Sequence, residues 1–224
     1  QTVMFRFLLT VMTLDKKYKA IAVGSLCSFA LMIFSFFIHY EFPLKLLSLS
    51  ALVLAAYFFS HQFLALIDFR KKAGESVTFI VLLLFSLTGL ICGILLAMFY
   101  RWYLGISLLP VSLHYFVIIA ALIGIIEELV FRGFIQQQVK SINGPFSILF
   151  STISHTGYKC CLFLAPVTTT GIDISILAFW TFLLGLLFGT IKHLSKSIIP
   201  SLIAHALFDI LVYAEFVKAP WWVW

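Results

Sequence analysis

Long apolar stretches constrain the fold of this chain more than any other feature of its sequence. A helix that crosses a bilayer needs about 20 apolar residues, whereas a transmembrane barrel strand alternates apolar and polar residues over about ten. Here the apolar stretches are continuous and short loops connect them. The expected spans are Ala20–Tyr40, Leu46–Ile67, Val77–Tyr100, Leu113–Gln136, Gly144–Ala165, Ile172–Ile191 and Ser197–Val217. The pattern predicts an all-α, polytopic membrane protein with about seven transmembrane helices.

The composition excludes a water-soluble globule. Of the 224 residues, 62% are hydrophobic and only 11% are charged, whereas soluble domains carry about 25% charged residues. Eleven of the 15 Lys and Arg residues fall on the side of the predicted spans that holds the N-terminus. Since cytoplasmic loops are enriched in basic residues, the N-terminus is expected in the cytoplasm. This bias accounts for the net charge of +6 without nucleic acid as a partner.

Ionisable side chains at membrane depth are costly and usually serve a function. Those inside the predicted spans are Glu127, Glu128 and Arg132 in the fourth, His155 in the fifth, and His205 and Asp209 in the seventh. At 1.5 Å per helical residue, Glu127, His155 and His205 lie roughly 14, 16 and 12 Å from the cytoplasmic ends of their spans. This common depth predicts one site that opens toward the cytoplasm or the cytoplasmic leaflet.

Helical spacing assigns these side chains to different tasks. Glu128 and Arg132 are four residues apart and can pair on one face, while Glu127 points about 100° away. Arg132 is therefore expected to turn toward Glu128 rather than Glu127. Asp209 shares a helical face with His205. The structural alternative is that both glutamates neutralise Arg132 and that His205 and Asp209 satisfy each other inside a helix bundle.

A carboxylate and two histidines in a wet membrane cavity suit amide hydrolysis by activated water. A glutamate can take a proton from water while one histidine positions that water. The second histidine and its neighbour can stabilise the oxyanion that forms on the attacked carbonyl. Glu, His and Asp are also acceptable zinc ligands, but H-E-x-x-H is absent, and no metal or cofactor is expected.

Three ordered motifs resemble the CAAX protease and bacteriocin-processing family, whose members include intramembrane glutamic endopeptidases. E-E-x-x-x-R at 127–132, followed by Gly-Phe, resembles the first signature of the family. His155 matches the middle histidine, and KSIIPSLIAHALFDIL at 196–211 resembles the last motif. The resemblance covers roughly Leu113 to Val217. Ser151 stands where the family usually has Phe, and Asp209 stands where it often has Asn.

The resemblance implies a role for each matched residue. Glu127 would be the general base and His155 its partner in activating water. His205 and Asp209 would stabilise the oxyanion. Glu128 and Arg132 would support the site. The chain would then comprise a cytoplasmic interfacial segment (1–19), a three-helix membrane region (20–112) and a four-helix catalytic core with an aromatic C-terminal anchor (113–224).

The function expected from the residues and the resemblance is that of an intramembrane glutamic endopeptidase. It would hydrolyse a peptide bond of a membrane-associated or lipid-modified protein or peptide, in a bacterial cytoplasmic membrane. The alternative is a non-catalytic membrane scaffold or a bacteriocin-immunity-type binding protein of the same family. A proton-coupled transporter is a third class, but the sequence carries no inverted repeat to support it. A membrane-protein partner is left open.

Overall fold

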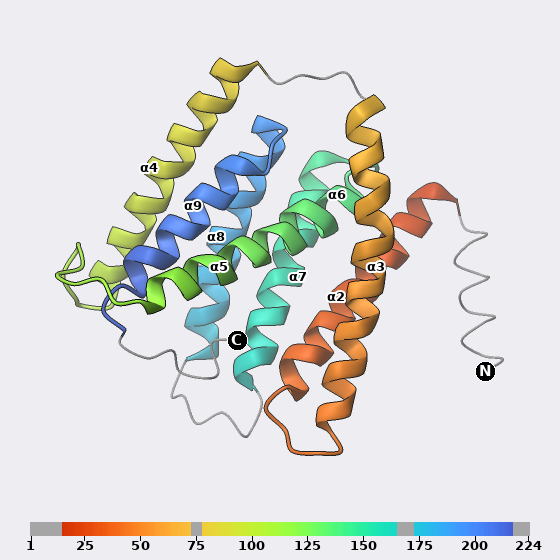
Figure 1. The fold of residues 1–224 in the computed structure, drawn as a ribbon, viewed down its shortest axis with the longest axis horizontal. Helices are drawn as coiled ribbons and strands as arrows, with labels where there is room; N and C mark the ends of the chain where they lie inside the picture. The colour runs from red at the N-terminus through yellow and green to blue at the C-terminus, as the bar shows by residue number, and fades with distance from the viewer. Residues whose placement is uncertain (1–14, 73–77, 165–172, 217–224) are drawn as a thin grey trace. The chain divides into compact units, whose positions relative to one another are not determined.

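The computed structural model describes residues 15–72, 78–164 and 173–216, and every regular element in these ranges is helical. The predicted interfacial segment, apart from its last residues, and the predicted tryptophan anchor lie outside these ranges. The elements are α2 (Lys16–Phe37), α3 (Lys45–Lys72), α4 (Phe79–Tyr103), α5 (Phe116–Glu128), η1 (Leu129–Ile135), α6 (Gln136–Val139), α7 (Gly144–Leu164), α8 (Ile174–Ser195) and α9 (Ile199–Val212), shown in Figure 1. The all-α prediction is therefore confirmed.

The fourth predicted span differs from a regular helix. It begins as α5 and ends as α6, but between them η1 is a π-helix, whose hydrogen bonds join residues five apart. Apolar periodicity does not distinguish such a segment from an α-helix, so the sequence did not predict it. The π-helix begins directly after Glu128 and contains Arg132, and π-helical segments are frequent at functional sites.

The chain divides into two compact units, of which the first comprises Gln1–Lys72 and Phe134–Leu183. In this unit α2 packs against α3, α6 and α7. A hydrogen bond from the Ser28 hydroxyl to the Ser154 hydroxyl, 2.8 Å long, joins α2 to α7. Gly24 of α2 allows this close packing, because a Cβ there would lie 3.2 Å from atoms of the Phe150 and Val139 side chains.

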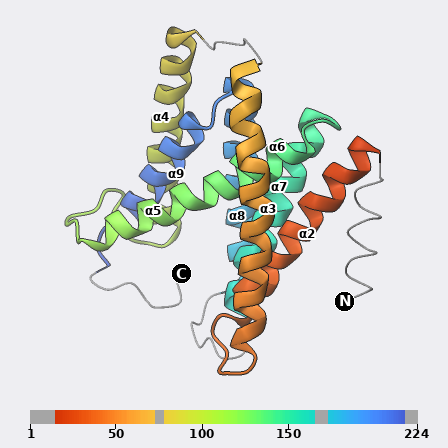
Figure 2. The same ribbon diagram turned by 45° about the vertical axis from the view of Figure 1, so that its right-hand side comes forward.

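The second unit comprises Ala73–Gly133 and Leu184–Trp224, and α9 packs in it against both α4 and α5. Figure 2 shows α4 and α9 side by side, as Figure 1 does. The buried face of α4 carries Gly89, Gly93, Ala97 and Arg101, each four residues after the one before. This ridge of small side chains lets the backbones of α4 and α9 approach closely.

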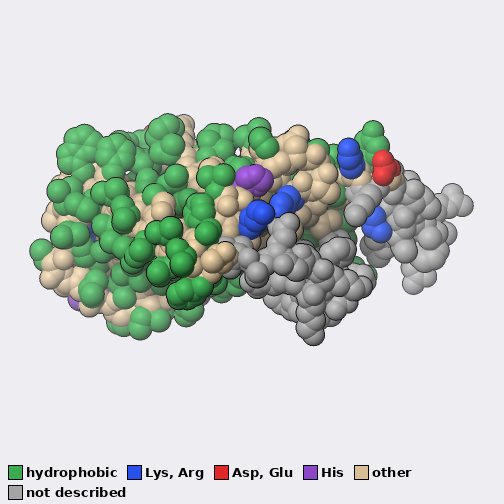
Figure 3. All heavy atoms as spheres, turned by 90° about the horizontal axis from the view of Figure 1, so that it is seen from above, with side chains coloured by type: hydrophobic (Ala, Val, Ile, Leu, Met, Phe, Trp, Pro, Cys, Tyr) green, Lys and Arg blue, Asp and Glu red, His purple; other side chains and the backbone are tan. Residues whose placement is uncertain are grey.

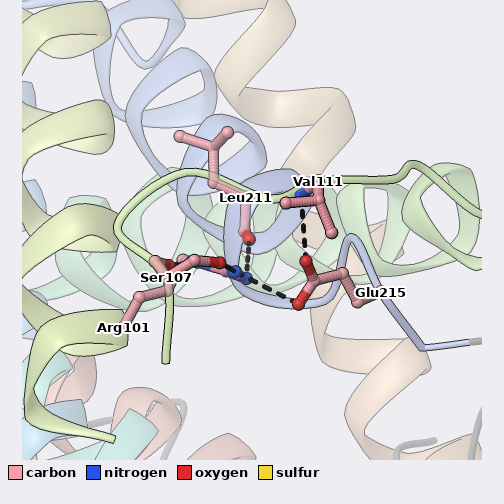
Figure 4. A network of polar contacts seen from close by, with 5 residues as sticks. All are labelled: Arg101, Ser107, Val111, Leu211 and Glu215. Atoms are coloured by element: carbon pink, nitrogen blue, oxygen red, sulfur yellow. Dashed lines mark hydrogen bonds and ion pairs between the residues drawn. The ribbon is translucent and has the colours of Figure 1, made fainter. Parts of the chain in front are cut away.

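A buried arginine holds the C-terminal ends of α4 and α9 together (Figure 4). The Arg101 guanidinium donates to the Ser107 carbonyl (2.7 Å), the Ser107 hydroxyl (3.0 Å), the Leu211 carbonyl (3.0 Å) and the Glu215 carboxylate (3.2 Å). Glu215 also accepts from the Val111 N–H at 2.9 Å. Glu215, which follows α9, therefore joins Arg101 to the loop before α5.

Exposed apolar side chains cover much of the face seen in Figure 3. The exposed large apolar residues include many of α3, α4 and α5, and a surface of this kind is suited to lipid. Three helices are long and apolar enough to cross a membrane among the described residues, namely Lys17–Phe37, Phe79–Tyr103 and Ile174–Ser195. Within the described residues, each predicted span overlaps a helical segment. The crossing of a bilayer by all seven remains a prediction.

Candidate active site

Two adjacent glutamates end α5 and are buried. Glu127 is 5% exposed and Glu128 is fully buried, as is Arg132 one turn further along the chain. A carboxylate that is removed from solvent in this way needs a charged or hydrogen-bonding partner. Two partners of Glu128 come from different elements, Arg132 from η1 and His205 from α9.

Glu128 joins an arginine to a histidine through a single oxygen atom. Its Oε1 lies 3.1 Å from Arg132 Nη1 and 3.1 Å from His205 Nδ1. The predicted pairing of Glu128 with Arg132 is therefore confirmed. The contact with His205 was not predicted, because it joins residues 77 positions apart that only the packing of α5 on α9 brings together. Glu128 thus contacts the imidazole directly.

The other ring nitrogen of His205 faces two further carboxylates. Nε2 lies 3.6 Å from Asp209 Oδ2 and 3.9 Å from Glu127 Oε2. Because the Glu128 carboxylate accepts a hydrogen bond from Nδ1–H, the ring is held with Nε2 toward Glu127 and Asp209. The Phe188 ring packs beside the imidazole with centroids 5.2 Å apart, which leaves the His205 ring little freedom to turn.

His155 lies on α7 in the first compact unit and is 4% exposed. It follows Ser151 by one helical turn, and their helix buries several further hydroxyl side chains. The structure thus brings together Glu127, Glu128, Arg132, His205 and Asp209 within the second unit. The assignment of His155 to the same site remains a prediction.

No group of three or more His, Cys, Asp or Glu side chains has a metal-binding arrangement within the described part of the chain. The side chains near His205 whose oxygen atoms could ligate a metal include Glu127, Glu128 and Asp209. These groups have acid–base and hydrogen-bonding chemistry of their own, since they pair carboxylates with an imidazole in a buried setting.

Comparison with known proteins finds a family that the C-terminal half of the chain resembles. Residues 110–211 match the type II CAAX prenyl endopeptidase Rce1-like family. The resemblance to the CAAX proteases that the motifs indicated is thereby confirmed. The matched segment begins before α5, ends within α9 and contains every predicted site residue. The match supports peptidase activity in general, and together with the apolar helices it indicates an integral membrane protein. No curated protein and no solved structure gives a significant match.

Proposed function

We propose that the protein is an intramembrane glutamic endopeptidase that hydrolyses a peptide bond of a membrane-associated or lipid-modified protein or peptide. The observation that carries this proposal is the contact of His205 with Glu128 at one nitrogen and its approach to Glu127 and Asp209 at the other. All four residues lie in the segment that matches a prenyl endopeptidase family.

Glu127 acts as the general base in this mechanism. Its carboxylate accepts a proton from a water molecule that His155 helps to position. The oxygen of this water then attacks the carbonyl carbon of the scissile bond. A new C–O bond forms and the carbonyl electrons move to the oxygen, which becomes an oxyanion. Glu127 then delivers the proton to the amide nitrogen as the C–N bond breaks, so that an acid and an amine leave.

His205 stabilises the oxyanion from its Nε2, which carries a proton when the imidazole is charged. Glu128 keeps accepting from Nδ1 throughout, and Arg132 holds the Glu128 carboxylate in place. Asp209, 3.6 Å from Nε2, favours the charged imidazole that this step uses. In this mechanism the site therefore supplies a general base, a hydrogen-bond donor to the oxyanion, and the groups that orient this donor.

The same proposal places seven helices across a bacterial cytoplasmic membrane with the N-terminus in the cytoplasm. The excess of Lys and Arg residues on the side of the membrane that holds the N-terminus supports this orientation. Substrate and water would then reach Glu127 from the cytoplasm or from the cytoplasmic leaflet. Reporter fusions in the loops between helices test the orientation independently of activity.

The decisive experiment is Glu127→Gln, followed by mass spectrometry of membrane peptides exposed to the purified protein in nanodiscs. The amide retains the shape of the side chain but cannot accept the proton, so cleavage should fall about 10²- to 10⁴-fold. Glu41→Gln is the matched control, since Glu41 is exposed in the loop between α2 and α3. Cleavage by Glu127→Gln at the wild-type rate would reject the assignment and favour a non-catalytic scaffold or immunity-type protein.

A second experiment separates glutamic from metal-dependent hydrolysis. Dialysis against a strong chelator should leave the rate of cleavage unchanged, because Glu127 and His155 activate the water in this mechanism. Loss of cleavage on chelation, with recovery on addition of zinc, would instead assign the same side chains to a metal site.

A further inference from the structure

A glycine on α5 lies against the carboxylate of Asp209. Gly124 is buried and precedes Glu128 by one helical turn. A Cβ at this position would overlap Oδ2 of Asp209 and would lie 3.2 Å from Cδ2 of the His205 ring. The atoms nearest to this position therefore belong to two side chains of the candidate active site.

This environment differs from those of the buried glycines on α4. A Cβ at Gly89 or Gly93 would meet backbone atoms of α9, at Pro200 and Ala204 respectively. A larger residue there would require the α9 helix to shift. At Gly124, by contrast, the obstructing atom is the end of a carboxylate that can rotate away. The missing side chain at Gly124 therefore makes room for Asp209 rather than for the approach of two helices.

We propose that Gly124 is a positioning residue, whose lack of a side chain lets the Asp209 carboxylate lie against α5 within reach of His205 Nε2. An alanine would rotate Asp209 away and remove its 3.6 Å approach to the imidazole. Because alanine is more favourable than glycine inside a helix, Gly124→Ala should not reduce the intrinsic stability of α5. The effect on peptide cleavage rests on the proposed function, whereas the effect on the His205 environment does not.

The test is a double-mutant cycle between Gly124→Ala and Asp209→Ala in nanodiscs. The first readout is the NMR signal of the His205 ring, assigned by its loss in His205→Gln. Gly124→Ala should move this signal in the same direction as Asp209→Ala, and the double variant should resemble Asp209→Ala alone. Thermal unfolding should show that Gly124→Ala is at least as stable as the wild type, and its rate of cleavage should fall to that of Asp209→Ala.

The outcomes separate the positioning role from the proposed function. A His205 signal that stays at its wild-type position in Gly124→Ala would overturn the positioning role, as would equal shifts in the presence and absence of Asp209. If Gly124→Ala fails to fold, the double variant decides, because removal of the carboxylate should restore folding. A double variant that also fails to fold would overturn the proposal. Coupling in the NMR signal without peptide cleavage by the wild-type protein would refute the peptidase assignment alone.

Discussion

The helices that carry the two predicted catalytic histidines are packed in different ways. His205 lies on α9, which packs against α4. A Cβ at Gly89 or Gly93 of α4 would meet backbone atoms of α9 first. On α7, which carries His155, the corresponding close contacts with α2 are made by side chains. A Cβ at Gly157 would overlap the methyl carbon of Met32 and lie 3.2 Å from its sulfur.

The polar contacts follow the same division. The C-terminal end of α9 is held by a buried guanidinium that donates to the Leu211 carbonyl, whereas α7 is joined to α2 by the hydroxyl pair of Ser28 and Ser154. Backbone atoms cannot move without moving the whole helix, but a methionine side chain adapts readily. The packing therefore fixes the position of α9 within its unit more tightly than that of α7 within the other.

Arg101→Met should produce the largest loss of stability, and it would break the comparison if it did not. Methionine retains much of the apolar volume but leaves the Ser107 and Leu211 carbonyls without their charged donor. Hydrogen bonds to charged groups contribute about 1.5–3 kcal/mol each, so we expect a loss of about 3 kcal/mol or more. Unfolding in detergent measures this loss, and Lys140→Met, at an exposed position, is the control.

Gly93→Ala should have the second largest effect. Overpacking by one methyl group typically costs about 1–3 kcal/mol, and the upper end applies here because the carbonyl of Ala204 cannot rotate away. Ala204 immediately precedes His205, so cleavage should fall together with stability. Ile91→Ala, on the exposed face of α4, should leave cleavage intact. A stable and active Gly93→Ala would show that α9 is free to adjust.

Ser28→Ala should destabilise the first unit by about 1 kcal/mol, the usual contribution of a neutral hydrogen bond. The Ser154 hydroxyl keeps its own bond to the Phe150 carbonyl, 2.8 Å away, so the remaining partner stays satisfied. The midpoint of chemical unfolding measures the change, with exposed Ser50→Ala as the reference. A loss as large as that of Arg101→Met would contradict the difference drawn between the two helices.

Gly157→Ala should have the smallest effect and therefore sharpens the comparison with Gly93→Ala. Both glycines lie inside helices, and alanine at either position would place its methyl group in occupied space. At Gly157 the occupant is the end of the Met32 side chain, and the gain in helix propensity of about 1 kcal/mol offsets its displacement. The change in unfolding free energy should be below about 1 kcal/mol. A much larger loss would mean that α7 is held as rigidly as α9.

Local spacing explains how much of this molecule could be predicted from the sequence. The apolar stretches located the helices to within a few residues. This was possible because a helix that crosses a bilayer needs about 20 apolar residues. The pairing of Glu128 with Arg132 followed from residues four apart on one helix. The family match adds support at the level of the motif, from Pro110 to Leu211.

Contacts between distant helices could not be predicted in this way. Arg101 directly follows the third predicted span, which ends at Tyr100, yet α4 continues to Tyr103 and the guanidinium is buried. The approach of Glu128 to His205 and of Gly124 to Asp209 depends on how α5 packs against α9, which no periodicity specifies. The π-helix of η1 was missed because a change in hydrogen-bond spacing leaves no clear trace in an apolar pattern.

The contact between α4 and α9 has a consequence for where this protein can be cut or transplanted. The matched segment starts at Pro110, after α4 has ended. A fragment that begins there would leave the Leu211 carbonyl and the backbone around Ala204 without the helix that covers them. The smallest portable piece that keeps the environment of α9 therefore starts at Phe79, and chimaeras that exchange this region should carry α4 with its own α9.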